Sequence, residues 1–402
     1  MRPWACAVAV VTLAACAEQP TADPPTPLRT DARAAPLTDA APLDADPPDA
    51  APPPPCDWTD VVALPTLLLD EDGRSPVKTF EVPADVESLT VVVLGRAGDL
   101  YVVERLTDGR GEALVSATPH GTVINRRDAE ALVFPGPFLS PNRVTWGDGV
   151  ATAMVPNNPQ VALAPGPWSL QVASVDALGW PARSIVDAWV LMRRVERACP
   201  AHHQDLHLHF TGAAGWWAGT AGRDPRYRDL LRTVTALYRD VGVTVRVASA
   251  QDIDARYRIV NGAEGLARLL GRGHADTGVD VFLVGRLQDP TGAPLAGVAG
   301  ALPGPALMPG TRASGVAVAI DLLADDDGLG VAVAHEVGHF LGLFHPSERD
   351  DRYPDQLPDT PLGEAATRNV MYRTTGDPRR RFSPMQGEVL RRSLAVVRAP
   401  GD

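Results

Sequence analysis

The stretch HEVGHFLGLFH, residues 335–345, constrains the fold of this chain more than any other part of its sequence. His335 and His339 are four residues apart, so in a helix they project from a common face. The apolar residues of the same segment form another face, which we expect to pack inward. They are Val333, Val337, Phe340 and Leu341. The pattern therefore predicts a helix that buries one face and presents two imidazoles.

Gly342 predicts where this helix ends, because glycine tolerates the left-handed backbone that closes many helices. After such a turn His345 can come back toward His335 and His339. Neutral imidazoles are favoured zinc ligands, and three protein ligands leave a fourth position open to water. We therefore predict a Zn²⁺ site of the catalytic type, with Glu336 placed to act on that water. A buried helix that carries its histidines incidentally is the alternative.

The same residues match the zinc motif H-E-x-x-H-x-x-G-x-x-H at every defined position, so residues 200–398 resemble the metzincin zinc peptidases. NVMYR, residues 369–373, resembles the Met-turn of that family, with Met371 beneath the imidazoles. LPDTP and FSPMQGEVLR make the pappalysin-like branch the nearest resemblance and matrixin-like enzymes the second. The resemblance implies a zinc helix against a twisted mixed sheet, and peptide hydrolysis with Glu336 as general base.

Two further segments carry weaker resemblances to the same family. GVAGALPG, residues 297–304, resembles the edge strand that holds an extended substrate through main-chain hydrogen bonds. The acidic segment that includes Asp355 and Asp359 either binds a structural Ca²⁺, as in pappalysin relatives, or is a solvated loop. Both interpretations of this acidic segment remain open.

Residues 200–402 alternate short apolar runs with helical patterns, which favours an α/β domain. DLHLHF, VTVRVAS, VDVFLVG and GVAVAID are the expected strands. Four histidines lie in or just before the first of these strands, and we interpret them as the polar face of a strand rather than as a second metal site. They are His202, His203, His207 and His209.

Residues 56–199 consist of short alternating or apolar runs between turn signals such as VPNNP and APGPW. That spacing predicts an all-β sandwich domain that precedes the α/β domain. No cluster of chemistry-bearing residues stands out in it. We expect Trp146, Trp168 and Trp180 to be core or sandwich-edge residues rather than a sugar-binding platform.

The chain begins with a short apolar run that ends in LAAC, residues 13–16, and resembles a bacterial lipoprotein signal. This implies a signal peptide over residues 1–15 and lipid on Cys16; an ordinary secretory signal is the alternative. Residues 16–55 are rich in Ala, Pro and Asp with almost no large apolar side chains, which predicts a disordered linker. We place the protein in the bacterial cell envelope, with the outer membrane favoured.

Export leaves Cys56 and Cys199 as the remaining pair of cysteines, and oxidising compartments permit disulfides. A disulfide between them is the leading interpretation; the alternative is that Cys56 binds the zinc as an inhibitory thiolate. The two cysteines lie at the first and last positions of the predicted β domain. The disulfide would therefore close that domain at its two ends.

The overall charge narrows the range of partners. The formal net charge is −12, Lys78 is the only lysine, and no basic cluster with interleaved aromatics exists, so we expect no nucleic-acid partner. We expect a monomer whose partners are a polypeptide substrate and, through Cys16, a membrane. The rival function is a surface-displayed binding lipoprotein with a catalytically silent domain; the intact Glu336 argues against it.

Overall fold

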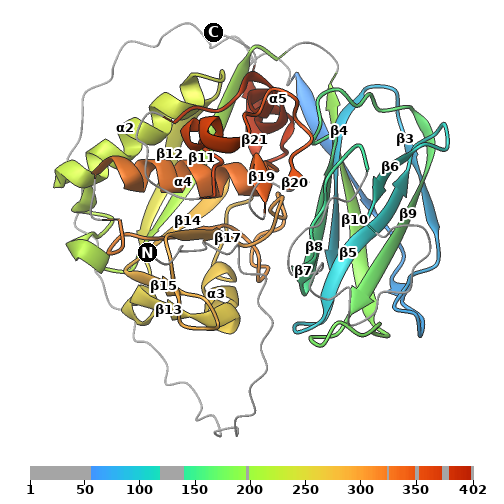
Figure 1. The fold of residues 1–402 in the computed structure, drawn as a ribbon, viewed down its shortest axis with the longest axis horizontal. Helices are drawn as coiled ribbons and strands as arrows, with labels where there is room; N and C mark the ends of the chain where they lie inside the picture. The colour runs from blue at the N-terminus through green and yellow to red at the C-terminus, as the bar shows by residue number, and fades with distance from the viewer. Residues whose placement is uncertain are drawn as a thin grey trace, which may run out of the picture.

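The computed structural model describes residues 56–117, 140–195, 199–323, 326–348, 353–373 and 380–399. The predicted signal peptide, Cys16 and the linker up to residue 55 lie outside them. No helix among the described residues has the length and apolar character needed to cross a membrane. The described chain forms a β region, residues 56–195, beside an α/β region, residues 199–399 (Figure 1).

The β region contains two antiparallel sheets that face each other (Figure 1). The first sheet has the order β1-β10-β4-β8, with β2 also paired to β10. Its strands are β1 (Asp57–Ala63), β2 (Leu67–Leu68), β4 (Val86–Leu94), β8 (Val150–Val155) and β10 (Ile185–Val195). The second sheet has the order β3-β9-β5-β6, with β7 also paired to β5. Its strands are β3 (Lys78–Val82), β5 (Leu100–Thr107), β6 (Ala113–Ser116), β7 (Gly147–Asp148) and β9 (Gly166–Val175).

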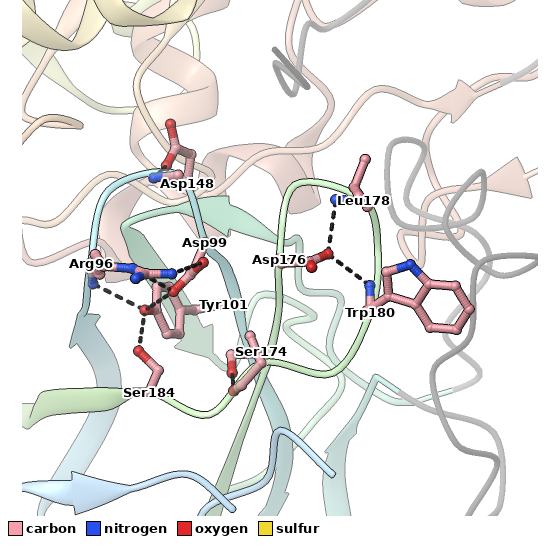
Figure 2. A network of polar contacts seen from close by, with 11 residues as sticks. Arg96, Asp99, Tyr101, Asp148, Ser174, Asp176, Leu178, Trp180 and Ser184 are labelled. Carbon is pink, nitrogen blue, oxygen red and sulfur yellow. Dashed lines mark hydrogen bonds and ion pairs between the residues drawn. The ribbon is translucent and has the colours of Figure 1, made fainter. Parts of the chain in front are cut away.

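The two sheets enclose one hydrophobic core, in which Trp146 and Trp168 are buried. Trp180 differs, because its side chain is 48% exposed. Figure 2 shows the reason: the Asp176 carboxylate accepts hydrogen bonds of 2.9 Å from the main-chain N–H groups of Leu178 and Trp180. This tight turn projects the indole outward, so Trp180 is a residue of the region's edge.

The α/β region is built on a six-stranded mixed sheet with the order β12-β11-β14-β18-β17 and β21 also paired to β11. Its strands are β11 (Ala201–Phe210), β12 (Thr244–Asp252), β14 (Val279–Val284), β17 (Gly297–Ala299), β18 (Val316–Ala319) and β21 (Val396–Ala399). The central strands are parallel, whereas β17 and β21 pair antiparallel. The mixed α/β character expected for this part of the chain is confirmed.

Helices cover both faces of this sheet (Figure 1). The main helices are α2 (Pro225–Arg239), α3 (Gly262–Leu270), α4 (Asp326–Phe340) and α5 (Pro384–Arg392). Short 3-10 turns are η1 (Ala213–Gly215), η2 (Ala221–Arg223), η3 (Ala255–Arg258) and η4 (Gly363–Arg368). Two small sheets complete the region, formed by β13 (Ile259–Asn261), β15 (Arg286–Gln288) and β16 (Pro294–Leu295), and by β19 (Ser347–Glu348) and β20 (Tyr353–Pro354).

Alternation along β11 separates the two faces of the sheet. Leu206, Leu208 and Phe210 belong to the larger core, which also contains the apolar side chains of α2 and α4. His207 and His209 point to the opposite face, where Leu269 and Leu270 of α3 pack on Phe282 and Val284. The helix that carries the HEVGH sequence is thus held between α2 and the sheet.

A disulfide joins Cys56 and Cys199, with their Cα atoms 5.6 Å apart. It links the start of the β region to the start of the α/β region. The alternative role of Cys56 as a zinc-binding thiolate is therefore wrong for this structure, because its sulfur is already bonded to Cys199.

We expect the double variant Cys56→Ser/Cys199→Ser to unfold more readily than the oxidised protein. The cysteines are 143 residues apart, and closing a loop of that size removes about 3–5 kcal/mol of chain entropy from the unfolded state. Urea unfolding with and without reductant measures the difference. A parent protein with the same urea midpoint in the presence and absence of reductant would contradict the expectation. The double variant lacks the disulfide and is the control.

Candidate metal centre

The helix α4 is buried on nearly all sides rather than on one face only. The predicted inward residues are buried, and Ala332 and Ala334 are buried as well. The hydroxyl of Tyr238 on α2 donates a hydrogen bond of 3.1 Å to the main-chain oxygen of Ala334. Small alanines let α2 and the sheet approach closely, so packing alone holds α4 in position.

Gly342 ends the helix as its residue type predicts, with φ of +106°. The N–H of Gly342 donates to the oxygen of His339 and the N–H of Leu343 donates to that of Gly338, each at 2.9 Å. This pair of bonds is the Schellman arrangement, which satisfies the last carbonyls of a helix while reversing the chain. The reversal brings His345 back to α4.

The three predicted ligands come together at one point. The Nε2 atom of His345 lies 3.1 Å from Nε2 of His339 and 3.3 Å from Nε2 of His335. In tetrahedral zinc coordination with Zn–N bonds of about 2.0–2.1 Å, ligand nitrogens lie about 3.3 Å from one another. The histidine nitrogens thus already have the spacing that a zinc ion requires.

The opposite ring nitrogens establish which tautomer is present. Nδ1 of His335 lies 2.8 Å from the oxygen of Val370, and Nδ1 of His339 lies 2.7 Å from the oxygen of Leu343. A carbonyl oxygen can only accept, so each Nδ1 carries the proton and each Nε2 presents a lone pair. Burial, with His339 and His345 nearby, lowers the pKa of His335 well below its usual value, which favours the neutral, metal-binding ring. Lone pairs that converge in this way can share one cation.

Glu336 lies beside the histidines, with 8% of its surface exposed, against the edge strand β17. Burial raises the pKa of Glu336 to about 8, and a hydrogen bond from the Ala299 main chain lowers it in part. A dication bound by the neighbouring imidazoles would lower that pKa further, because opposite charge favours the carboxylate. Gly297 makes the close approach feasible, since a β-carbon there would lie 2.7 Å from Oε1 of Glu336.

Met371 lies in the loop that supplies the Val370 carbonyl, and it is completely buried. Its sulfur packs against α4 at Gly338, between the first two histidines in sequence. The side chain of Asn369 orients this loop by accepting a hydrogen bond of 2.8 Å from the Met371 N–H. Met371 thus packs on α4 between two of the candidate ligands, and the neighbouring Val370 oxygen contacts His335 directly.

A second group of candidate metal ligands lies on the α3 side of the sheet and consists of His209, His274 and Asp280. Nε2 of His209 is 2.6 Å from Oδ1 of Asp280, and Gln251 Nε2 is 2.9 Å from Nδ1 of His209. Burial acts to raise the pKa of Asp280, but hydrogen bonds from His209 and from the Ala275 N–H leave it lowered overall. Each ring nitrogen of His209 thus has a protein hydrogen-bond partner, so we interpret the group as a polar network in which His209 and Asp280 are buried and His274 is exposed.

The predicted calcium residues each have protein partners. Asp359 accepts hydrogen bonds of 2.8 Å from Ser383 Oγ and from the Met385 N–H, and so holds the start of α5. Oδ1 of Asp355 accepts from the Leu357 N–H and from the Thr360 hydroxyl. Among the described residues these two aspartates do not form a metal-ligand group. Calcium binding gains no support and stays a prediction.

Several contributors to the centre carry no sequence signature. The carbonyls of Val370 and Leu343 and the N–H of Ala299 are main-chain groups, which any residue would supply. Asp280 and His274 were not expected as partners of His209. Their only sequence signal is the acidic residue inside the apolar run VDVFLVG, since a buried strand accepts a carboxylate only with a partner.

No family model matches the chain, and no curated protein matches it. Among solved structures, metalloproteinase-II from Bacteroides fragilis is similar at 13% sequence identity and a TM-score of 0.32. The similarity covers 51% of this chain and 62% of that one, so the chain spans less than two thirds of that structure. A likeness this weak decides nothing about activity, and function must be inferred from the chain's own residues.

We expect the purified protein to bind one zinc ion per chain, and we expect a chelator to lower its melting temperature, because only the folded chain gathers the three imidazoles. His345→Ala should lose the metal. His274→Ala is the matched control, since the hydrogen-bonded network does not require an ion. Metal analysis of the three proteins is the measurement. Equal zinc contents in both variants would contradict the assignment.

We also expect Asp355 to make stability depend on pH. Burial raises its folded-state pKa to about 7, whereas the unfolded value is about 4. The folded state therefore binds more protons between these values, and its stability falls as pH rises through that window. Between pH 5 and pH 8, the free energy of unfolding of the parent should fall by on the order of 2 kcal/mol relative to that of Asp355→Asn.

Urea unfolding of the two proteins at both pH values measures this difference. Saturating Ca²⁺ at pH 8 is an informative addition, because an ion bound by Asp355 would restore the lost stability of the parent alone. A parent-to-variant difference that is the same at both pH values would show that Asp355 is not a buried titrating group.

Proposed function

We propose that this chain is a zinc endopeptidase. The observation that carries the proposal is the convergence of three imidazoles at zinc-ligand spacing, with Glu336 next to them. A helix with incidental histidines would have no reason to aim both Nδ1 protons at carbonyls and all three Nε2 atoms at one point. The match to the metzincin motif supports the same conclusion independently of the geometry.

The residues have separable roles in peptide hydrolysis. Zinc, when bound, makes water acidic and polarises a substrate carbonyl. Glu336 accepts the proton of the attacking water and passes it to the nitrogen of the leaving amine, so that the C–N bond breaks as a C–O bond forms. The strand β17 has one sheet partner among the described residues, β18, and its other side can pair with an extended polypeptide.

We also propose that the protein acts outside the cytoplasm, anchored by lipid on Cys16. The LAAC sequence supports the anchor. The disulfide between Cys56 and Cys199 supports the compartment, because such bonds persist where the surroundings are oxidising. The substrate would then be a polypeptide of the cell envelope or of the surroundings.

The test of the proposed activity is Glu336→Gln. This change keeps the shape of the side chain and removes the base, so zinc content should be unchanged while cleavage slows by at least about a hundredfold. Cleavage of casein and of a mixed peptide library is the measurement. Glu112→Gln, at an exposed turn of the β region, is the matched control and should cleave normally.

Two results would overturn the proposal. One is a zinc-loaded parent protein that cleaves neither casein nor the peptide library. The other is a Glu336→Gln variant that cleaves at the rate of the parent. The first result would leave the metal centre itself intact and would favour the rival function of a binding lipoprotein.

A further inference from the structure

Strands β4 and β8 of the first sheet are buried on both faces, which an independent sandwich domain would not need. Along β4, Leu89, Val91 and Val93 belong to the core between the two sheets. Val92, between them, belongs to the core of the α/β region. Strands β8 and β10 repeat this division, and their residues toward the α/β region include Met154 and Leu191. One sheet therefore contributes to two cores.

Polar contacts fasten the same face of this sheet to the α/β region. Arg193, whose side chain is 4% exposed, donates hydrogen bonds of 2.9 Å and 2.7 Å to the oxygens of Ser393 and Val396. Ser88 donates one of 2.7 Å to the oxygen of Arg392. Since these acceptors belong to the end of α5 and to β21, the sheet is joined to the last structural elements described.

Strand β8 contacts the two chain segments that shape the metal centre. Met154 lies against the helix-ending turn, so closely that a β-carbon on Gly342 would be 2.6 Å from its Cε atom. Two residues earlier, Thr152 donates a hydrogen bond to the oxygen of Pro303, in the loop that follows β17. That loop is also joined to the end of α4, because the N–H of Gly304 donates a hydrogen bond of 2.8 Å to the oxygen of Phe340.

Other contacts surround the same turn and the same loop. The guanidinium of Arg143 lies 4.9 Å from the centre of the Phe344 ring, next to the third ligand in sequence. The Asp148 carboxylate, visible at the end of the β region in Figure 2, forms an ion pair of 2.8 Å with Arg312. Side chains of the β region thus contact the segments 342–345 and 300–315 through packing, a hydrogen bond, a cation–π contact and an ion pair.

We propose that strand β8 is a positioning element of the metal centre, in which Met154 holds the left-handed turn at Gly342 and thereby places His345. Gly342 alone permits many conformations, because glycine loses more freedom on folding than any other residue. The Met154 side chain removes that freedom from one side, and the hydrogen bonds from the turn back to α4 restrict it further. The β region is then a permanent part of the metal centre.

The proposal rests on the proposed function only for its effect on catalysis; its effect on metal binding is separate. Residues that orient metal ligands from outside the first coordination shell typically change metal affinity about tenfold to a hundredfold. We expect Met154→Ala to weaken zinc binding by such a factor. Met154→Leu, which refills most of the volume, should bind zinc within a few-fold of the parent.

Met192→Ala is the matched control. Met192 lies in β10 of the same sheet and is 2% exposed, but it faces the core between the two sheets. Both methionine-to-alanine changes create a cavity and should lower the unfolding midpoint to a similar degree. Only the change at Met154 should weaken zinc binding.

Zinc affinity of the full chain is measured by competition with a chromophoric chelator, at a temperature where every variant is folded. A Met154→Ala variant that binds zinc as tightly as the parent would overturn the proposal. Equal weakening in Met154→Ala and Met192→Ala would also overturn it, since that result would indicate general loosening. Should the alanine variant not fold, Met154→Val against Met192→Val gives the same comparison. Because no cleavage is measured, these results are independent of the peptidase assay.

Discussion

Two hydrogen bonds from histidine rings to main-chain carbonyls are the interactions on which the metal centre depends. They hold the protons of His335 and His339 on Nδ1, so that the metal-binding lone pairs face inward. Each carbonyl is itself fixed. The Val370 oxygen belongs to a loop tied by Asn369 to Gln386 of α5 at 2.9 Å, and the Leu343 oxygen follows the helix-ending turn. Ligand geometry is therefore a property of the whole region and not of α4 alone.

Contacts that support the metal centre also come from outside the α/β region. Hydrophobic burial is not directional, so a core can cross a domain boundary wherever a second apolar face is available. Here the sheet of β1, β10, β4 and β8 presents such a face, and the residues that pack on it include the turn of the third ligand. A substitution in the β region can consequently alter the geometry of the metal centre through direct packing contacts, without a long chain of intermediate residues.

Much of the centre was predictable from sequence because it is local. The spacing of His335, His339 and His345, with glycine at 342, is a short-range pattern whose geometry follows from helix and turn stereochemistry. The Cys56–Cys199 bond followed from elimination, and the α/β character from alternating patterns. Met154 was not predictable, since its contact joins residues far apart in the chain. A hint existed in VATAMV, residues 150–155, because Thr152 is its one polar residue and the segment lacks the alternation of a strand with one solvent face.

The pairing of β21 with β11 has a consequence for the order of events during synthesis. Residues 396–399 lie antiparallel to residues 201–204, so a late strand completes the sheet on the very strand that begins the α/β region. Contacts of such separation form slowly, because a long loop must close before they are made. A growing chain cannot assemble the full sheet, nor the carbonyls that Arg193 binds, until those late residues have emerged. The sheet against which α4 packs would thus be complete only once residues 396–399 have been synthesised.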